Sequence, residues 1–184
     1  MVVVKHNGTI YIARSCWGFK DNAARKNRQV NCENFDVWHP EGNENRLMAV
    51  MEGNRFADLI RYEDVFPEPF DPKRLVLESY DKIYKLAEHF DLCDNYELPC
   101  RVVFAENDRA LLLLSEGGCF EIEDVYSDLL DDNAVFALSD FKGISEPYEF
   151  IKEVYTAVED VRSYVMFPVV VMNTKSNEIT IIER

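Results

Sequence analysis

The sequence predicts an α+β fold with two stacked, mostly antiparallel sheets flanked by helices. Two short apolar segments, residues 1–5 and 9–14, are separated by Asn7 and Gly8, which tolerate the positive φ angles of a two-residue hairpin turn. Helical patterns occur in separate groups and do not alternate with strands as in a βαβ fold. Successive apolar residues, as in 111–114, indicate strands that are covered on both faces.

After the opening hairpin, the first half of the chain is expected to contain two short strands and two helices. Residues 27–37 hold one strand, and residues 47–51 form a buried strand that ends at Gly53. From Phe56 onward, apolar residues recur at i, i+3 and i+4, which predicts a helix directly after that glycine. An apolar face at helical spacing predicts a longer helix over 72–90, next to a connector marked by Pro67, Pro69 and Pro72.

The second half is expected to be richer in strands. A four-residue loop at 106–109 joins two of them, and Gly117 and Gly118 turn the chain into the next. Ser145 is a suitable N-cap for a helix with Pro147 in its first turn. The expected elements are strands at 101–105, 110–114, 119–123 and 134–138, the helix after Ser145, and strands at 165–172 and 178–182.

Composition predicts an acidic, cytoplasmic protein with one domain, residues 1–184. A hydrophobic content of 47% over 184 residues suffices for a full core. The net charge of −14 disfavours partners with phosphate backbones and anionic membrane surfaces. No segment approaches the roughly 20 apolar residues of a membrane span, and the first residues lack the pattern of a signal peptide. Five scattered cysteines are expected to be reduced thiols.

Neither a metal nor a cofactor is expected. The histidines at 6, 39 and 89 are far apart, and the cysteines follow no common zinc-site spacing. An acidic run between Glu121 and Asp132 is expected to be a solvated loop, with weak binding of Ca²⁺ or Mg²⁺ as the alternative. The run comprises Glu121, Glu123, Asp124, Asp128, Asp131 and Asp132.

Four stretches, in this order, resemble the proteasome-type N-terminal-nucleophile hydrolases, and most of all the bacterial peptidase ring that works with an ATP-driven unfoldase. Residues 2–13 resemble the family's opening hairpin, and residues 47–58 its strand–glycine–helix junction. Residues 103–122 resemble its central meander, and the final helix with the last hairpin resembles its C-terminal segment. The resemblance implies a single domain with four layers, αββα.

The family's catalytic residues transfer poorly. Its nucleophile is an N-terminal threonine whose own amine acts as base. By the register of the hairpin, Met1 falls about two residues beyond that threonine, and Val2 has no nucleophilic atom. The family's aspartate falls at Ser15, its lysine has no counterpart in residues 29–32, and its later Gly-Ser-Gly aligns with residues 130–132. Gly53 matches the glycine whose backbone N–H helps to form the oxyanion hole.

Two functions from different classes follow. The first is a non-catalytic, oligomeric binding or assembly protein, with a possible protein partner and with the helices at 53–62 and 72–90 as its ring-type interface. The second is a peptidase or amidohydrolase that uses Cys16 or Ser15 near Gly53, with His6 as a candidate base. A true N-terminus upstream of Met1 would restore a threonine-type peptidase, and a chance resemblance would leave an orphan α+β domain.

Overall fold

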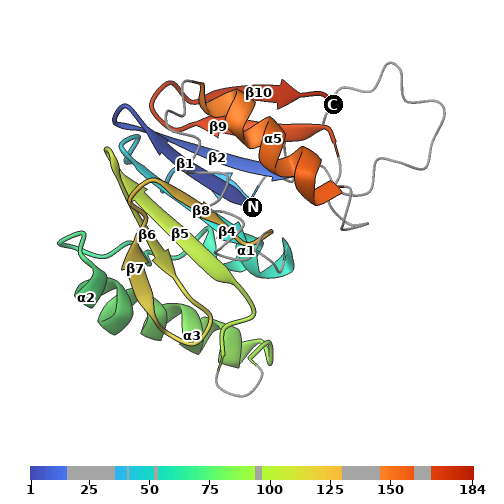
Figure 1. The fold of residues 1–184 in the computed structure, drawn as a ribbon. Coiled ribbons are helices and arrows are strands. Elements are labelled where there is room, and N and C mark those ends of the chain that lie inside the picture. The colour runs from blue at the N-terminus through green and yellow to red at the C-terminus, as the bar shows by residue number, and fades with distance from the viewer. Residues whose placement is uncertain (16–35, 41, 52–53, 94–96, 130–145, 160–166) are drawn as a thin grey trace. The chain divides into compact units, whose positions relative to one another are not determined.

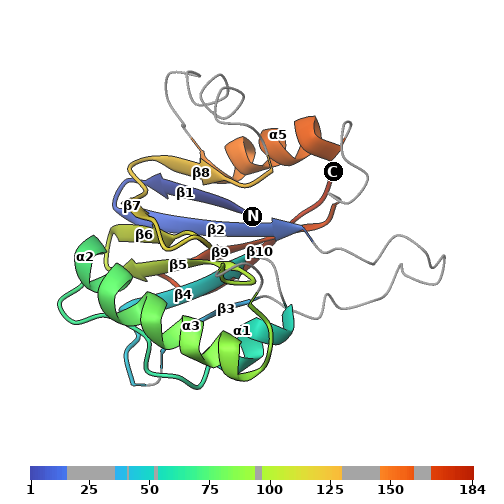
Figure 2. The same ribbon diagram turned by 90° about the horizontal axis from the view of Figure 1, so that it is seen from below.

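The strands of the computed structural model form two antiparallel sheets of five strands each. The structure describes residues 1–15, 36–40, 42–51, 54–93, 97–129, 146–159 and 167–184. The chain divides into two compact units: Met1–Phe35 with Asp124–Arg184, and Asp36–Glu123. One sheet belongs to each unit, and helices accompany both, as Figures 1 and 2 show. The predicted α+β class with antiparallel sheets is therefore confirmed.

The sheet of the first unit has the strand order β10-β9-β2-β1-β8, and all its pairs are antiparallel. The predicted opening hairpin is confirmed, with φ values of 50° at Asn7 and 71° at Gly8. Its five strands are β1 (Val2–His6), β2 (Thr9–Ser15), β8 (Val125–Ser127), β9 (Val169–Asn173) and β10 (Glu178–Ile182).

Helix α5 (Pro147–Glu159) packs against one face of this first sheet (Figure 1). Its buried residues recur at helical spacing and form a core with alternate residues of the strands, among them Val2 and Val4. The hydroxyl of Tyr155 donates a buried hydrogen bond of 3.0 Å to the carbonyl of Ala13. This bond ties α5 to β2, which is the partner of the first strand.

The sheet of the second unit has the order β3-β4-β5-β6-β7. Its strands are β3 (Val37–Trp38), β4 (Arg46–Met51), β5 (Arg101–Glu106), β6 (Arg109–Leu113) and β7 (Cys119–Glu121). Glu106 pairs with Arg109, so the expected four-residue loop is a two-residue turn with Asn107 at a φ of 56°. Glu106 and Arg109 are therefore the last paired residues of β5 and β6, and only Asn107 and Asp108 remain in the turn.

Helices cover one face of the second sheet (Figure 2). They are α1 (Asn54–Ile60) and a continuous helical segment made of α2 (Pro72–Arg74), η3 (Leu75–Ser79) and α3 (Tyr80–His89). Asp71 begins the segment by accepting a 3.0 Å hydrogen bond from the backbone N–H of Arg74. The predicted helix over 72–90 is thus confirmed, with one π-helical turn within it.

The structure corrects the expected acidic loop. Val125–Ser127 form strand β8, which pairs with β1 in the first sheet. Glu121 lies in β7 and forms an ion pair with Arg109. The predicted strand at 119–123 therefore ends at Glu121, since the chain then crosses to the other sheet. The predicted strand at 134–138 and most of that at 27–37 lie outside the described residues.

Among the described helices, none has the length and apolar character needed to cross a membrane.

Candidate functional site at the amino terminus

Strand β1 lies between β2 and β8, so the first residue of the chain is enclosed by a sheet. Met1 is 6% exposed and Val2 is fully buried. A charged ammonium in such a place is costly unless an opposite charge and hydrogen bonds compensate it. The carboxylate of Asp128 supplies that charge through an ion pair with the Met1 amine. The side chain of Asp128 is itself 12% exposed.

Strand β8 positions this carboxylate. Its last residue, Ser127, lies opposite Val2, and the backbone N–H of Asp128 donates a 3.3 Å hydrogen bond to the carbonyl of Met1. The hydroxyl of Ser127 accepts a 3.1 Å hydrogen bond from the N–H of Leu129, which fixes the chain as it leaves the strand. Backbone pairing and the ion pair therefore hold Asp128 and the N-terminus together from both sides.

The arrangement at Met1 differs from that of an N-terminal nucleophile. That chemistry needs a hydroxyl or thiol on the first residue and an amine available to accept its proton. Met1 carries a thioether, Val2 an aliphatic side chain, and the amine is engaged in an ion pair with Asp128. In the described part of the chain, this site anchors the N-terminus and offers no acyl-transfer group on residues 1 and 2.

Of the predicted catalytic residues Ser15, Cys16 and Gly53, the structure describes only the backbone of Ser15. Ser15 is the last residue of β2 and pairs with Val169; its backbone is described and its side chain is not. Cys16 and Gly53 lie outside the described residues, as do residues 130–132. Val2 pairs with Ala13, so Ser15 lies at the same end of the sheet as the Met1 amine. The register thus brings Ser15 toward the site of Asp128 without showing a catalytic contact.

The register of the hairpin separates His6 from Ser15. His6 pairs with Thr9 at the other end of the hairpin. Six residue steps separate Thr9 from Ser15, which corresponds to about 20 Å along a strand. His6 is therefore too distant from Ser15 for proton transfer, and its predicted role beside Cys16 stays a prediction because Cys16 lies outside the described residues. The His6 ring instead lies 2.8 Å from the side-chain nitrogen of Asn7 in the exposed turn.

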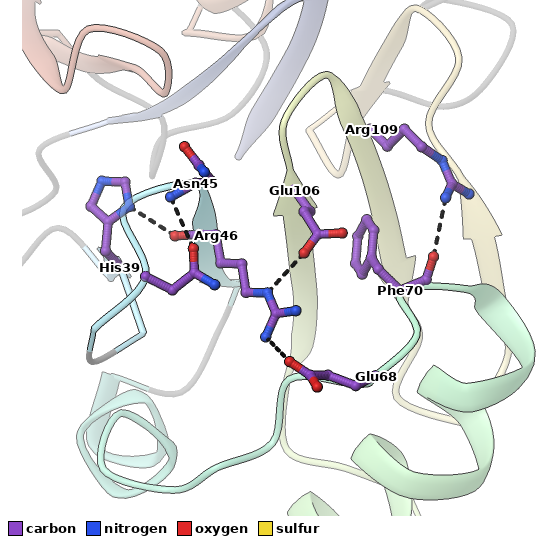
Figure 3. A network of polar contacts seen from close by, with 8 residues as sticks. His39, Asn45, Arg46, Glu68, Phe70, Glu106 and Arg109 are labelled. Atoms are coloured by element: carbon purple, nitrogen blue, oxygen red, sulfur yellow. Dashed lines mark hydrogen bonds and ion pairs between the residues drawn. The ribbon is translucent and has the colours of Figure 1, made fainter.

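A second polar cluster lies in the other unit (Figure 3). Arg46 forms ion pairs of 2.8 Å with Glu106 and 2.7 Å with Glu68, and its guanidinium lies 4.7 Å from the centre of the Phe66 ring. Burial lowers the pKa of Arg46, but hydrogen bonds with both carboxylates outweigh this and raise it above its usual value. His39 contacts the Arg46 carbonyl at 2.8 Å.

Arg109 makes a similar set of contacts. It binds Glu121 through two nitrogens, at 3.0 and 2.8 Å. It also donates a 3.1 Å hydrogen bond to the carbonyl of Phe70, as Figure 3 shows. Phe70 and Glu68 belong to the segment between α1 and α2. Both arginines are engaged by carboxylates of the chain itself, so we interpret the cluster as a clamp that holds this segment on the sheet.

The described cysteines are poor nucleophiles. Burial raises the pKa of the Cys119 thiol to about 11 and also raises that of Cys93. Cys100 is buried in the core beneath the helices. All three are free thiols in this structure, while Cys16 and Cys32 lie outside the described residues. No group of three or more His, Cys, Asp or Glu suited to a metal ion occurs in the part that the structure describes.

Sequence reasoning missed Asp128 as a site residue. It belongs to a run of six acids, and the apolar signal of β8 amounts to little more than Val125 and Tyr126. The contact joins residues 127 positions apart, so it becomes visible only when β8 is paired with β1.

Comparisons with known proteins show the fold. No protein-family model matches the chain, and no curated protein matches it. Among solved structures, BPH of Thiobacillus denitrificans in complex with epoxomicin is 14% identical, with a TM-score of 0.66 over 99% of this chain and 97% of that one. Anbu, described as an ancestral β-subunit, from Yersinia bercovieri is 10% identical, with a TM-score of 0.61 over 100% and 86%.

Eukaryotic HslV from Trypanosoma brucei is 11% identical, with a TM-score of 0.57 over 100% of this chain and 98% of that one. All three have the proteasome-like N-terminal-nucleophile fold, so the resemblance predicted from sequence is confirmed at the level of fold. Each unit of the chain supplies one sheet and one helical layer, the elements that an αββα arrangement requires.

Proposed function

We propose that this chain is a proteasome-like protein without the N-terminal threonine nucleophile, and that it works as a non-catalytic, self-associating binding or assembly protein. The observation that carries the proposal is the ion pair between the buried Met1 amine and Asp128. This ion pair engages the Met1 amine, the group that would act as base in an N-terminal nucleophile, and neither Met1 nor Val2 provides a hydroxyl or thiol. The proposal takes residues 1–184 as one domain, since the first unit combines both ends of the chain.

Epoxomicin offers a direct test of the non-catalytic part. BPH of Thiobacillus denitrificans has been solved in complex with this compound. We expect the intact mass of the present chain to remain unchanged after incubation with epoxomicin, because residues 1 and 2 carry no nucleophile. A stoichiometric increase in mass would overturn the non-catalytic assignment. The same spectrum reports the mass of the native N-terminus, which must begin at Met1 for the amine to pair with Asp128.

The helices of the second unit support self-association. Seven large hydrophobic residues are exposed in the described part of the chain, and four of them lie in or directly after these helices. Tyr62, just after α1, is 85% exposed, and Leu77, within η3, is 61% exposed; Phe90 and Leu92 follow α3. Exposed apolar side chains on the helices of one unit are candidates for an interface when they form a common patch. Anbu of Pseudomonas aeruginosa, which has the same fold, has been solved as a helical assembly. We therefore propose a second copy of this chain as the partner of these helices.

The oligomeric state tests this interface. Native mass spectrometry and light scattering should show assemblies larger than a monomer, and Leu77→Glu and Tyr62→Glu should each shift them toward smaller species. Ala157→Glu is the matched control, because it introduces the same charge at an exposed position of α5 in the other unit. A wild-type chain that is monomeric at all concentrations would contradict the assembly role.

One observation favours a second candidate function, an amide or peptide hydrolase that uses Ser15 or Cys16. The register of β1 and β2 places Ser15 at the end of the sheet where the Met1 amine and Asp128 lie. This hypothesis requires selective labelling of Cys16 by a thiol-reactive probe, or loss of peptide hydrolysis in Ser15→Ala or Cys16→Ala. Uniform, slow labelling of all cysteines and no turnover in the wild type would exclude it.

A further inference from the structure

Strand β10 is an edge strand with exposed apolar side chains. It ends the order β10-β9-β2-β1-β8, and within the described residues it pairs with β9 alone (Figure 1). Ile179 and Ile181 are each 42% exposed, whereas Ile182, which points to the opposite face, is buried against α5. Edge strands usually carry lysine, proline or a bulge that discourages pairing with another chain. The five residues of β10 include none of these.

We infer that β10 pairs antiparallel with β10 of a second copy of this chain, about a two-fold axis at Thr180. In an edge strand the free backbone groups belong to alternate residues. Two identical edges can therefore meet only when the paired residue numbers are both odd or both even. This restricts the symmetric pairing to registers centred on a residue, such as Ile179, Thr180 or Ile181.

The sequence selects one of these registers. When the axis is at Thr180, Ile179 of each copy lies opposite Ile181 of the other, which gives two cross-strand isoleucine pairs on the sheet face that carries both side chains. An axis at Ile181 would instead place Ile179 opposite the acidic Glu183, and an axis at Ile179 would place Ile181 opposite Asn177. The register at Thr180 is thus the one among these three that pairs both exposed isoleucines with apolar partners.

Charge supports the same register. Each copy carries a net charge of −14, so a shared edge must avoid placing acidic residues opposite one another. With the axis at Thr180, Glu178 lies opposite Ile182 and diagonal to the basic Arg184 of the second copy, within reach of long side chains. Glu183 lies opposite the neutral Asn177. Opposite charges are therefore neighbours across this edge, and no two acids face each other.

This contact is separate from the helical interface proposed above and does not rest on it. A pair of five-residue strands is a small interface, so we expect weak association that depends on protein concentration. Sedimentation velocity in the Leu77→Glu background isolates it from any association through the helices. A concentration-dependent monomer–dimer equilibrium is expected there; a monomer at every accessible concentration would overturn the inference.

Charge substitutions test the register itself. Ile179→Lys and Ile181→Glu, each in the Leu77→Glu background, should weaken self-association at least tenfold. When the two variants are mixed, the new lysine lies opposite the new glutamate, and the other isoleucine pair is intact, so a heterodimer should form. Phe120→Lys is the control, because Phe120 is similarly exposed in β7, an edge strand of the other sheet.

The outcomes are distinct. Unchanged self-association in both single variants would show that β10 is not the contact. Loss in the single variants without recovery in the mixture would refute the register at Thr180. Far-ultraviolet circular dichroism and thermal melting of each variant confirm that the monomer is folded, so a loss of pairing is not mistaken for a loss of structure.

Discussion

Asp128→Ala would remove the carboxylate from a buried ion pair and leave the ammonium of Met1 inside the sheet. Breaking such a pair by deleting one partner typically costs about 3–5 kcal/mol. Asp128 keeps 12% of its side-chain exposure, and some water can reach the site after the substitution. We therefore expect the lower end of this range, about 3 kcal/mol. Asp128→Asn should cost less, about 1–2 kcal/mol, because its amide oxygen can still accept a hydrogen bond.

Urea unfolding followed by circular dichroism measures this loss as a lower midpoint with an unchanged slope. Asp124→Asn is the matched control, since Asp124 is an exposed acid at the other end of β8. Chemical acetylation of the Met1 amine provides the second arm of a double-mutant cycle. In the acetylated protein, Asp128→Ala should cost far less than in the free-amine protein. An equal cost in both forms, or a cost below about 0.5 kcal/mol, a change typical of ordinary surface substitutions, would refute the ion pair as the anchor of β1.

Three further predictions concern the rest of the described structure. Tyr155→Phe removes the buried hydrogen bond to the Ala13 carbonyl and should lower the free energy of unfolding by about 1 kcal/mol, measured by urea unfolding. Arg46→Ala removes two ion pairs and a ring contact and should cost about 1–2 kcal/mol, with a smaller effect in 1 M salt because Glu68 is solvent-exposed. Cys119, with a pKa of about 11 against an ordinary 9.0, should react with iodoacetamide about tenfold faster per pH unit up to pH 11, as site-resolved mass spectrometry would show. Because folding raises this pKa, the neutral thiol contributes stability below pH 9 that is lost as the pH rises through 11.

Elements with a local sequence signal could be predicted from the sequence. Strand β8, which depends on pairing with a distant strand, could not. Asn7 and Gly8 specify the opening turn by themselves, and the helix over 72–90 repeats its apolar face through several turns. Strand β8 has only three residues, and it forms because β1 offers an unpaired edge more than a hundred positions earlier. Nothing within a short acidic segment indicates such a partner, so its local pattern predicts a loop.

The residues of the candidate site likewise fall into those that the sequence predicts and one that it does not. The resemblance to the family predicts Ser15 and Gly53, and Cys16 follows from its place after the second strand. Strand register shows that Ser15 lies at the Met1 end of the sheet, far from His6, and Cys16 and Gly53 lie outside the described residues. Asp128 could be recognised as a site residue only from the pairing of β1 with β8, which no local sequence pattern indicates. Nothing in the sequence distinguishes Asp128 from the other acidic residues, of which the chain has 34 in total.

The role of Asp128 distinguishes a chain that begins at Met1 from a chain that has residues upstream of Met1. In a chain that begins at Met1, its carboxylate neutralises a buried ammonium, and the amine serves the structure of the sheet. In a chain with residues upstream, Met1 would contribute a neutral peptide N–H, and the same carboxylate would face no cation there. A two-residue extension ahead of Met1 should then destabilise the protein by an amount similar to that of Asp128→Ala, and combining both changes should cost less than their sum. Additive costs would instead show that Asp128 acts independently of the N-terminus, which would remove the main argument for a non-catalytic protein.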